Sequence, residues 1–161
     1  NSVVANPEFL SEDTAEDDAK HPDIVVIGGD HKQYVEDVRG IYQSHIKTAK
    51  IFTTDTITAE MSKYAINTFY ATKVTFANQI FDVAQRVGAN YEMIKDIMYN
   101  RKWIGKNHLD VWNKGGRGSG GKCLRKDLDA FENYSKSKLL KTVRDLNDEY
   151  LSKYPKKENY D

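Results

Sequence analysis

The strongest constraint on the fold of this chain is a run of about 30 residues in which apolar side chains recur every three or four positions. The recurring positions are Met61, Ala65, Phe69, Thr72, Phe76, Ile80, Val83 and Val87. This spacing predicts one amphipathic helix over residues 58–87, capped by Asp55 or Thr56 and ended by Gly88. A helix of that length exceeds what a domain of this size ordinarily buries alone. We therefore expect it to pack either against a second copy of the chain or across its own neighbours.

The first 55 residues predict a small α/β portion. Residues 3–5 look like the end of a strand, and the β-branched run 23–29, closed by glycines, is typical of a buried strand. A helix is expected over 34–45 and a further strand over 50–53, while the polar, acidic stretch 11–22 is expected to be a loop. The order strand, helix, strand over 23–53, preceded by the end of a strand at 3–5, is too short for a complete doubly wound domain.

The remainder of the chain predicts further helices. We expect helices near 91–99, 124–134 and 136–151, and an irregular, glycine-rich stretch over 101–122. The predicted fold class is mainly α with a small α/β N-terminal portion, in which these helices pack on the long central helix. The predicted domains are an α/β segment over 1–55, a helical domain over 56–153, and a polar, frayed tail over 154–161.

The charge balance narrows the choice of partners. The 161 residues contain 24 Lys and Arg against 24 Asp and Glu, which gives no general attraction to nucleic acid or to an anionic membrane. No apolar run approaches the roughly 20 residues of a membrane span, and no secretory segment opens the sequence. A single cysteine forbids an internal disulfide and favours a reducing, cytoplasmic location. Because the sequence opens at Asn1 and runs directly into apolar residues, we expect a fragment or a naturally short protein.

Residues 115–123 form a glycine-rich run, Gly-Gly-Arg-Gly-Ser-Gly-Gly-Lys-Cys, that matches parts of two nucleotide-binding patterns. A P-loop needs Ser or Thr after its lysine to hold Mg²⁺, and this chain has Cys123 there. A dinucleotide loop needs a strand on either side of its helix, whereas helices follow here. Both patterns are therefore disfavoured. The preferred interpretation is a loop whose backbone amides approach a sugar or phosphate closely, and a flexible loop without function is the alternative.

Cys123 follows the glycines at the predicted start of a helix, with Lys122, Arg125 and Lys126 close in sequence. A helix N-terminus and nearby cations both favour the thiolate, which is the nucleophilic form of cysteine. Asp127 lies one helical turn further on, where a carboxylate can orient a water molecule or hold a lysine. Cys123 is therefore a candidate nucleophile, and a small buried hydrophobe is the alternative.

Lys63 and Asn67 lie four positions apart on the long helix, so they share one face of it. A cation and an amide donor on a rigid helix can stabilise a developing oxyanion or position a water molecule. Glu8 follows the Asn-Pro turn at 6–7 and can act as a general acid or base. Spacing alone favours a solvated surface pair for Lys63 and Asn67, and it leaves Glu8 undecided.

Four separate blocks of sequence resemble, in order and spacing, the UDP-glucose/GDP-mannose dehydrogenase family. The blocks are 6–12 (NPEFLSE), 59–69 (AEMSKYAINTF), 71–79 (ATKVTFANQ) and 120–127 (GGKCLRKD). Residues 87–90 fit as well, and the resemblance spans roughly residues 1–150. It implies the end of an N-terminal NAD-binding Rossmann domain over 1–55, followed by the central domain through which the family dimerises. The partners implied are a nucleotide sugar and a second copy bound through helix 58–87.

The family oxidises the C6 alcohol of a nucleotide sugar to a carboxylate with NAD⁺ as hydride acceptor. The resemblance implies that the Cys123 thiol attacks the C6 aldehyde to give a thiohemiacetal, which becomes a thioester that water hydrolyses. NAD is the cofactor implied, but we expect weak or absent NAD binding and little activity from this chain alone. UDP-glucose is the favoured substrate, because the short link over residues 131–134 is more similar to UDP-glucose members of the family.

The resemblance also implies roles for single positions, and it implies no metal. Lys63, Asn67 and Asp127 match the positions that handle the oxyanion and the water. Glu8 matches the carboxylate of acid–base work and thioester hydrolysis. The positions that match cofactor contacts are Glu12 and Lys126. The positions that match substrate-binding segments are Phe9, Leu10, Gly118, Ser119, Gly120 and Gly121.

Three positions depart from the family pattern. The family commonly has glycine at Asp13, glutamate at Gln79 and proline at Arg125. These departures support an alternative function, a non-catalytic dimerisation module that keeps the fold of the family without its chemistry. The presence of every matched catalytic residue, Cys123 included, supports the enzyme.

Overall fold

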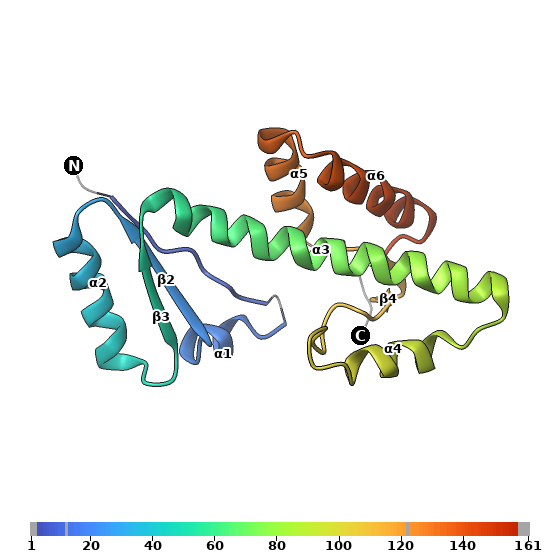
Figure 1. Ribbon diagram of the computed structural model, residues 1–161, viewed down its shortest axis with the longest axis horizontal. Coiled ribbons are helices and arrows are strands. Elements are labelled where there is room, and N and C mark those ends of the chain that lie inside the picture. Colours follow the sequence, from blue (N-terminus) through green and yellow to red (C-terminus); the bar gives the residue numbers. More distant parts are fainter. Residues whose placement is uncertain (1–2, 12, 122, 158–161) are drawn as a thin grey trace. The chain divides into compact units, whose positions relative to one another are not determined.

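The predicted long helix is present as α3 (Thr56–Val87) in the computed structural model of the chain (Figure 1). Asp55 caps its start, since its carboxylate accepts the Thr58 amide at 2.9 Å and the Thr58 hydroxyl at 2.6 Å. These two hydrogen bonds, of which the one from the Thr58 hydroxyl has the larger effect, hold the pKa of Asp55 below its ordinary value of 3.8. Gly88 follows the last turn with a φ of +72°, a left-handed conformation that glycine adopts without strain.

The structure describes residues 3–11, 13–121 and 123–157. The chain separates into two units, Asn1–Ala65 and Ile66–Asp161, and the boundary falls inside α3. The domain limits expected from the sequence, at 55 and at 153, stay predictions. Over the described residues, no helix combines the length and the apolar character needed to cross a membrane.

The first unit contains a three-stranded sheet in the order β1–β2–β3. Its elements are β1 (Val4–Ala5), β2 (Ile24–Gly29), α2 (Lys32–His45) and β3 (Lys50–Thr54). β2 pairs with β1 antiparallel and with β3 parallel, and α2 is the crossover between the parallel strands (Figure 1). Val25 and Ile27 of β2 pack against Val35 of α2, which gives this unit its apolar core. The expected small α/β portion is therefore confirmed.

The loop expected over 11–22 contains a short helix, α1 (Ala15–Lys20), so that prediction is wrong. Asp18 holds the segment before the helix, because its carboxylate accepts the Ser11 amide at 2.8 Å and the Thr14 hydroxyl at 2.9 Å. Acidic side chains in the first turn and a lysine in the last turn interact favourably with the helix dipole and so stabilise α1. No residue of α1 is buried, so no apolar periodicity marks this helix in the sequence.

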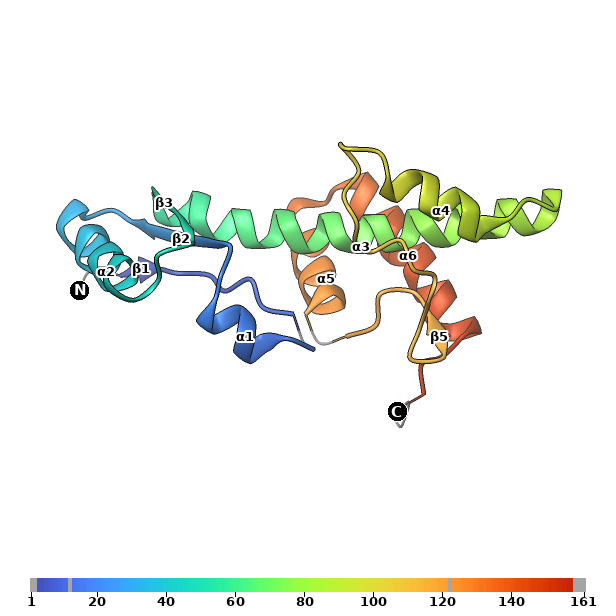
Figure 2. The same ribbon diagram turned by 90° about the horizontal axis from the view of Figure 1, so that it is seen from below.

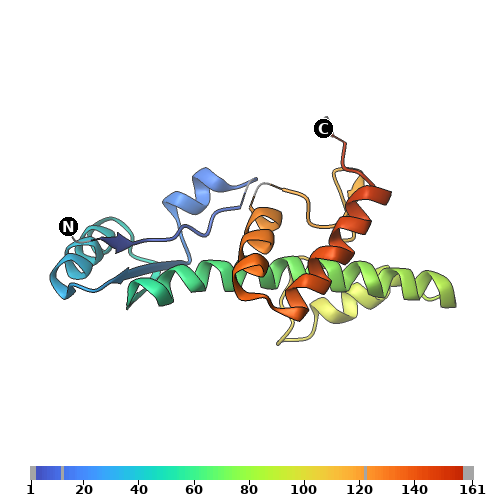
Figure 3. The same cartoon turned by 90° about the horizontal axis from the view of Figure 1, so that it is seen from above.

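The second unit consists of helices on α3, as the sequence predicts. The helices are α4 (Tyr91–Tyr99), α5 (Leu124–Ser135) and α6 (Lys138–Lys153). Ala77 and Ala84 of α3 form one core with Tyr91 of α4, and the two helices run side by side (Figures 1 and 2). Ala71 of α3 forms another core with Leu128, which lies on α5, and with apolar side chains of α6 (Figure 3).

The stretch 101–122, expected to be irregular, contains a small antiparallel hairpin. Its strands are β4 (Trp112–Asn113) and β5 (Gly116–Arg117). The segment after α6 extends this hairpin, because the Arg117 amide donates to the Tyr154 carbonyl and the Lys157 amide donates to the Lys114 carbonyl, both at 3.0 Å. Residues 154 and 157 of the tail are therefore bonded to the hairpin region, residues 158–161 lie outside the described residues, and the frayed tail stays a prediction.

The apolar stripe of α3 does not face the core of its own chain. Phe69 is 60% exposed, Phe76 50% and Val83 42%. The buried positions of α3 carry small or polar side chains, namely Ala59, Asn67, Thr68, Ala71, Thr75, Ala77, Asn78 and Ala84. Small side chains let neighbouring segments approach the helix closely. Ile80 and Phe81 pack on the core formed with α4, whereas Phe69, Phe76 and Val83 stay largely uncovered by the described residues.

Gly28, near the end of β2, tests how tightly the first unit is packed. A Cβ on Gly28 would lie 2.4 Å from the Ala59 Cβ and 2.6 Å from the Asp55 carbonyl oxygen. We predict that Gly28→Ala lowers the free energy of unfolding by about 1–3 kcal/mol, because the backbone must shift to make room. Gly40 is exposed in α2 with nothing near it, so Gly40→Ala should raise that free energy by about 0.5–1 kcal/mol. Urea unfolding measures both values, and shifts of the same sign would contradict the prediction.

His108 is a half-buried titratable group in the second unit. Its ring stacks on Tyr70 with the centroids 4.2 Å apart, and its backbone has a φ of +61°. Its Nδ1 is buried and has no hydrogen-bond partner among the described residues. Burial first, and the charge of Lys73 second, lower the pKa of His108 below its ordinary value of 6.5. The folded state therefore favours the neutral ring.

This preference makes the stability of the second unit depend on pH. The contribution of His108 is complete above a pH of 6.5 and is lost as the pH falls, because the unfolded chain then binds a proton that the folded chain resists. We predict that the free energy of unfolding falls from about pH 7.5 to about pH 5.5 more steeply in the parent than in His108→Asn. Asparagine is the control because it tolerates a left-handed backbone. Urea titrations at both pH values check this, and parallel slopes in the two proteins would refute it.

Candidate functional site

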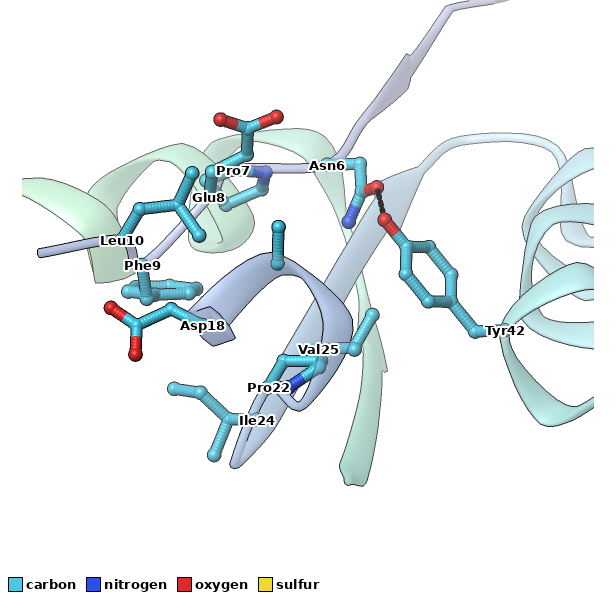
Figure 4. A pocket seen from close by; sticks show the side chains of 11 residues that line it. Asn6, Pro7, Glu8, Phe9, Leu10, Asp18, Pro22, Ile24, Val25 and Tyr42 are labelled. Carbon is cyan, nitrogen blue, oxygen red and sulfur yellow. Dashed lines mark hydrogen bonds between the residues drawn. The ribbon is translucent and has the colours of Figure 1, made fainter. Parts of the chain in front are cut away.

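The first group of candidate residues lies on the loop after β1. Asn6 anchors this loop, since its Nδ2 donates to the Val26 carbonyl at 2.7 Å and its Oδ1 accepts the Tyr42 hydroxyl at 2.6 Å (Figure 4). These bonds tie the loop to β2 and α2 just before Pro7, whose ring fixes the backbone of the turn. The position of Glu8 and Phe9 is therefore set by residues that precede them.

Lys63, near the start of α3, holds the same loop from another side. Its Nζ donates to the Glu8 carbonyl oxygen at 2.5 Å and lies 5.5 Å from the centroid of the Phe9 ring. The contact is with the backbone of Glu8, while the Glu8 side chain is exposed. Three candidate residues, Glu8, Phe9 and Lys63, are thus brought together within the first unit.

A pocket of about 100 Å³ lies beside this loop (Figure 4). Phe9 and Leu10 line it together with Pro22 and Ile24, so its wall is largely apolar. Ligand pockets usually enclose roughly 300–1,000 Å³. The pocket by itself is therefore smaller than the pockets that usually enclose a whole small-molecule ligand.

The second group of candidates is built around a buried amide–carboxylate pair. Asn67 of α3 donates its Nδ2 to Oδ2 of Asp127 at 2.6 Å, and both residues are 6% exposed. Asp127 lies in the first turn of α5, where the helix dipole favours a carboxylate. The Lys126 Nζ approaches the other carboxylate oxygen at 3.6 Å from an exposed position. Asp127 is therefore desolvated but has partners for both oxygens.

Cys123 occupies the N-cap position of α5, as the sequence predicts. Its carbonyl accepts the Asp127 amide at 3.0 Å, and its thiol is free and half-buried. Of the nearby cations, Lys122 lies outside the described residues, while Arg125 forms an ion pair with Asp148 at 3.0 Å. The geometry places the thiol and the Asn67-bonded carboxylate on the same first turn of one helix.

The glycine loop, residues 115–121, leads to Cys123 and packs in part against α6 of its own chain. Gly118 and Ser119 are buried, Gly120 is partly buried and Gly121 is exposed. Gly118 has a φ of +88°, and a Cβ there would meet side chains of α6. A glycine at 118 is therefore required by packing within the chain, and contact of the loop with a substrate stays a prediction.

Arg117 is a residue of this region that no local sequence pattern singles out. It is 2% exposed, its Nε donates to Oδ1 of Asn78 at 2.8 Å, and its Nη2 donates to Oδ1 of Asp82 at 2.7 Å. Four aromatic rings surround the guanidinium carbon at 4.6–5.8 Å, those of Phe81, Trp112, Tyr150 and Tyr154. This cage anchors the start of the glycine loop to α3, to α6 and to the segment after α6.

Tyr150 links the cage to Gln79, one of the departures from the family pattern. The Tyr150 hydroxyl donates to Oδ2 of Asp82 at 2.7 Å and accepts Nε2 of Gln79 at 2.8 Å. Burial first, and the bond to Asp82 second, raise the pKa of Tyr150 to about 12. The hydroxyl therefore stays protonated near neutral pH, and Gln79 has a structural partner.

The surroundings of the glycine run match neither of the two nucleotide-binding patterns. The strand that leads in, β4, is exposed and two residues long, and the elements that follow are α5 and α6. Among the described residues, no group of three or more His, Cys, Asp or Glu side chains is arranged to hold a metal ion.

The candidate residues divide between the two units. Those on the loop after β1 and the start of α3 belong to the first unit, and those on the rest of α3, the glycine loop and α5 belong to the second. Lys63 and Asn67 lie one turn apart on α3, as their spacing predicts. Glu12, one of the two positions matched to cofactor contacts, lies outside the described residues. The chemical roles of all these residues stay predictions.

Comparison with known proteins identifies relatives for both parts of the chain. Residues 57–149 match the central domain of the UDP-glucose/GDP-mannose dehydrogenase family, and residues 1–46 match the NAD binding domain of the same family. The UDP-glucose 6-dehydrogenase of Rickettsia felis is 38% identical over 148 residues, which are 88% of this chain and 32% of that protein. The UDP-glucose 6-dehydrogenase of Bacillus subtilis is 38% identical over 130 residues, 81% of this chain and 28% of that protein.

Solved structures give the same result for the fold. The UDP-glucose dehydrogenase of Pyrobaculum islandicum superposes with a TM-score of 0.83 and 31% identity, covering 92% of this chain and 34% of that chain. This chain therefore spans about a third of the length of the relatives that it matches.

Proposed function

Because the chain belongs to the UDP-glucose/GDP-mannose dehydrogenase family, we propose that it is the central part of an NAD-dependent nucleotide-sugar 6-dehydrogenase. The proposed reaction oxidises the C6 alcohol of the sugar to a carboxylate through a covalent intermediate on Cys123. UDP-glucose is the favoured substrate, in line with the relatives named UDP-glucose 6-dehydrogenase. The observation that carries the proposal is the first turn of α5, which presents a free thiol at Cys123 and a buried Asp127 bonded to Asn67.

In this proposal Cys123 is the nucleophile. Its sulfur forms a bond to the C6 aldehyde carbon, and the carbonyl oxygen takes up a proton to give a thiohemiacetal. At the later thioester stage, water attacks the carbonyl carbon, the carbon–sulfur bond breaks, and the sulfur leaves to restore the thiol. Asp127, held by Asn67, is suited to orient that water because its carboxylate is fixed and desolvated. The resemblance gives oxyanion stabilisation to Lys63 and proton transfer to Glu8.

Each of the two oxidations, from alcohol to aldehyde and from thiohemiacetal to thioester, releases one hydride and one proton, so two molecules of NAD⁺ would be needed to take up the hydrides from one sugar. The residues present do not form a dinucleotide site. The match to the NAD binding domain covers residues 1–46, where the described residues form two strands and helices without a Gly-x-Gly-x-x-Gly turn. That pattern occurs only at 116–121, which begins in a two-stranded antiparallel hairpin and is followed by helices. We therefore propose that the 161 residues alone bind NAD weakly or not at all and turn over little or no substrate.

A non-catalytic dimerisation module is the alternative function. Two departures from the family pattern support it, because Gln79 and Arg125 have structural partners in Tyr150 and Asp148. The exposed stripe of α3 fits both functions, since it concerns association and not chemistry. The reactivity of Cys123 distinguishes them.

The single cysteine makes this test direct, because alkylation by iodoacetamide reports on Cys123 alone. We predict that near neutral pH the folded chain reacts several-fold faster than the chain unfolded in urea, since a helix N-terminus favours the nucleophilic form of cysteine. Added NAD⁺ should leave the rate unchanged. Mass spectrometry follows the reaction. A folded rate below the unfolded rate would support the dimerisation module, and protection by NAD⁺ would refute weak cofactor binding.

We also propose that a second copy of the chain covers the exposed stripe of α3. Phe69, Phe76 and Val83 are seven positions apart, so they lie on one side of the helix. Their burial would contribute about 25 cal/mol for each Å² of apolar surface removed from water. This is one of the two packings that the length of the predicted helix leaves open, and the one that the family resemblance implies.

Sedimentation velocity tests the proposed dimer. We predict that the parent sediments as a dimer and that Phe76→Lys sediments as a monomer, because an ammonium group within an apolar interface would lose its hydration without a partner. Gln85→Lys is the control, since Gln85 is exposed and lies about half a turn around α3 from Phe76. A monomeric parent, or equal disruption by both lysines, would contradict the proposed interface.

A further inference from the structure

Asn147 of α6 is a buried polar residue for which the proposed mechanism has no use. The residue is 1% exposed, and within the part of the chain that the structure describes its side chain makes three hydrogen bonds to Ser119 of the glycine loop. Its Oδ1 accepts the Ser119 amide at 2.7 Å and the Ser119 hydroxyl at 2.9 Å, while its Nδ2 donates to the Ser119 carbonyl at 3.1 Å. The amide group thus satisfies both backbone groups of one loop residue.

The glycines on either side of Ser119 allow this contact. A Cβ on Gly118 would lie 3.1 Å from Oδ1 of Asn147 and 3.3 Å from Cγ of Leu151. A Cβ on Gly120 would lie 3.0 Å from Cδ2 of Leu151. Asn147 and Leu151 are one turn apart on α6, so together they form the surface on which the loop lies.

The same helix also holds the segment on the other side of Cys123. Asp148, next to Asn147, pairs with Arg125 of α5 at 3.0 Å. Ser119 precedes Cys123 by four positions, and Arg125 follows it by two. β5, at the start of the loop, runs beside α6 in Figure 2. Cys123 therefore lies in the sequence between two residues, Ser119 and Arg125, that bind neighbouring positions of α6.

We infer that Asn147 is a positioning residue for Cys123. Only a side chain with a donor and an acceptor at this reach can satisfy both the amide and the carbonyl of Ser119, because either group left buried without a partner costs free energy. With both groups paired, Ser119 is fixed on α6 four positions before Cys123, and in this way Asn147 helps to place the thiol at the start of α5. The inference rests on the proposed function to the extent that the positioned thiol is the nucleophile.

The test measures the pH profile of Cys123 alkylation in folded variants of the chain. In Asn147→Ala the alkylation rate of Cys123 should change several-fold toward the rate of the urea-unfolded chain, because the loop no longer holds the thiol in place. The pH dependence of that rate should also shift toward the pH dependence of the unfolded chain. Val143→Ala is the matched control, since Val143 lies one turn earlier on α6 and packs in the core with Leu128. It should lower the thermal midpoint and leave the pH profile of the parent unchanged.

A second variant keeps the test decisive if alanine prevents folding. Asn147→Asp retains the volume and the acceptor for the Ser119 amide but loses the donor to the Ser119 carbonyl, so it should shift the profile in the same direction. A folded variant at Asn147 with the parental profile, or an equal shift in Val143→Ala, would overturn the positioning role. Failure of the proposed function is a different result, in which the parent itself reacts no faster than the unfolded chain.

Discussion

A buried guanidinium group loses its hydrogen bonds to water and must form other interactions in their place. Arg117 donates hydrogen bonds to Asn78 and Asp82 and contacts four aromatic rings. Removing such a charge from water costs several kcal/mol unless it is paired. Its partners come from α3, from the hairpin, from α6 and from the segment beyond α6, so one charge fixes the relative positions of four segments of the second unit. The glycine loop begins at this point, and its geometry depends on the cage.

Local patterns in the sequence are sufficient for most of the fold. The periodicity of α3, the glycine at its end and the β-branched run of β2 each act within a few residues, so each predicts its element. α1 escapes prediction because charge stabilises it and no residue of it is buried. Which side of α3 packs against its own chain could not be predicted, for another reason. Its stripe is apolar, but the neighbours available in the chain pack on small side chains such as Ala71 and Ala77.

The candidate site divides in the same way. The place of Cys123 at a helix start follows from the glycine run and the helical pattern after it. The contact of Asn67 with Asp127 joins residues 60 positions apart, so spacing could suggest each of them but not the bond. No local pattern marks Arg117 or Asn147, because their hydrogen-bond partners Asn78, Asp82 and Ser119 lie 28–39 positions away. The i, i+4 pair of Tyr150 and Tyr154 was a visible signal, but nothing local connects it with an arginine in the hairpin.

Some of the residues that hold the glycine loop in place, those of α6 and of the segment after it, come later in the chain than the loop itself. Ser119 is paired with a residue 28 positions further on, and Arg117 donates its amide to Tyr154. During synthesis from the N-terminus, the loop therefore leaves the ribosome before the surface on which it rests. Until α6 has emerged and docked, the loop has its contacts with α3 through Arg117 but lacks those with Asn147 and Tyr154. The order of translation thus delays the attachment of Ser119 until α6 has been made.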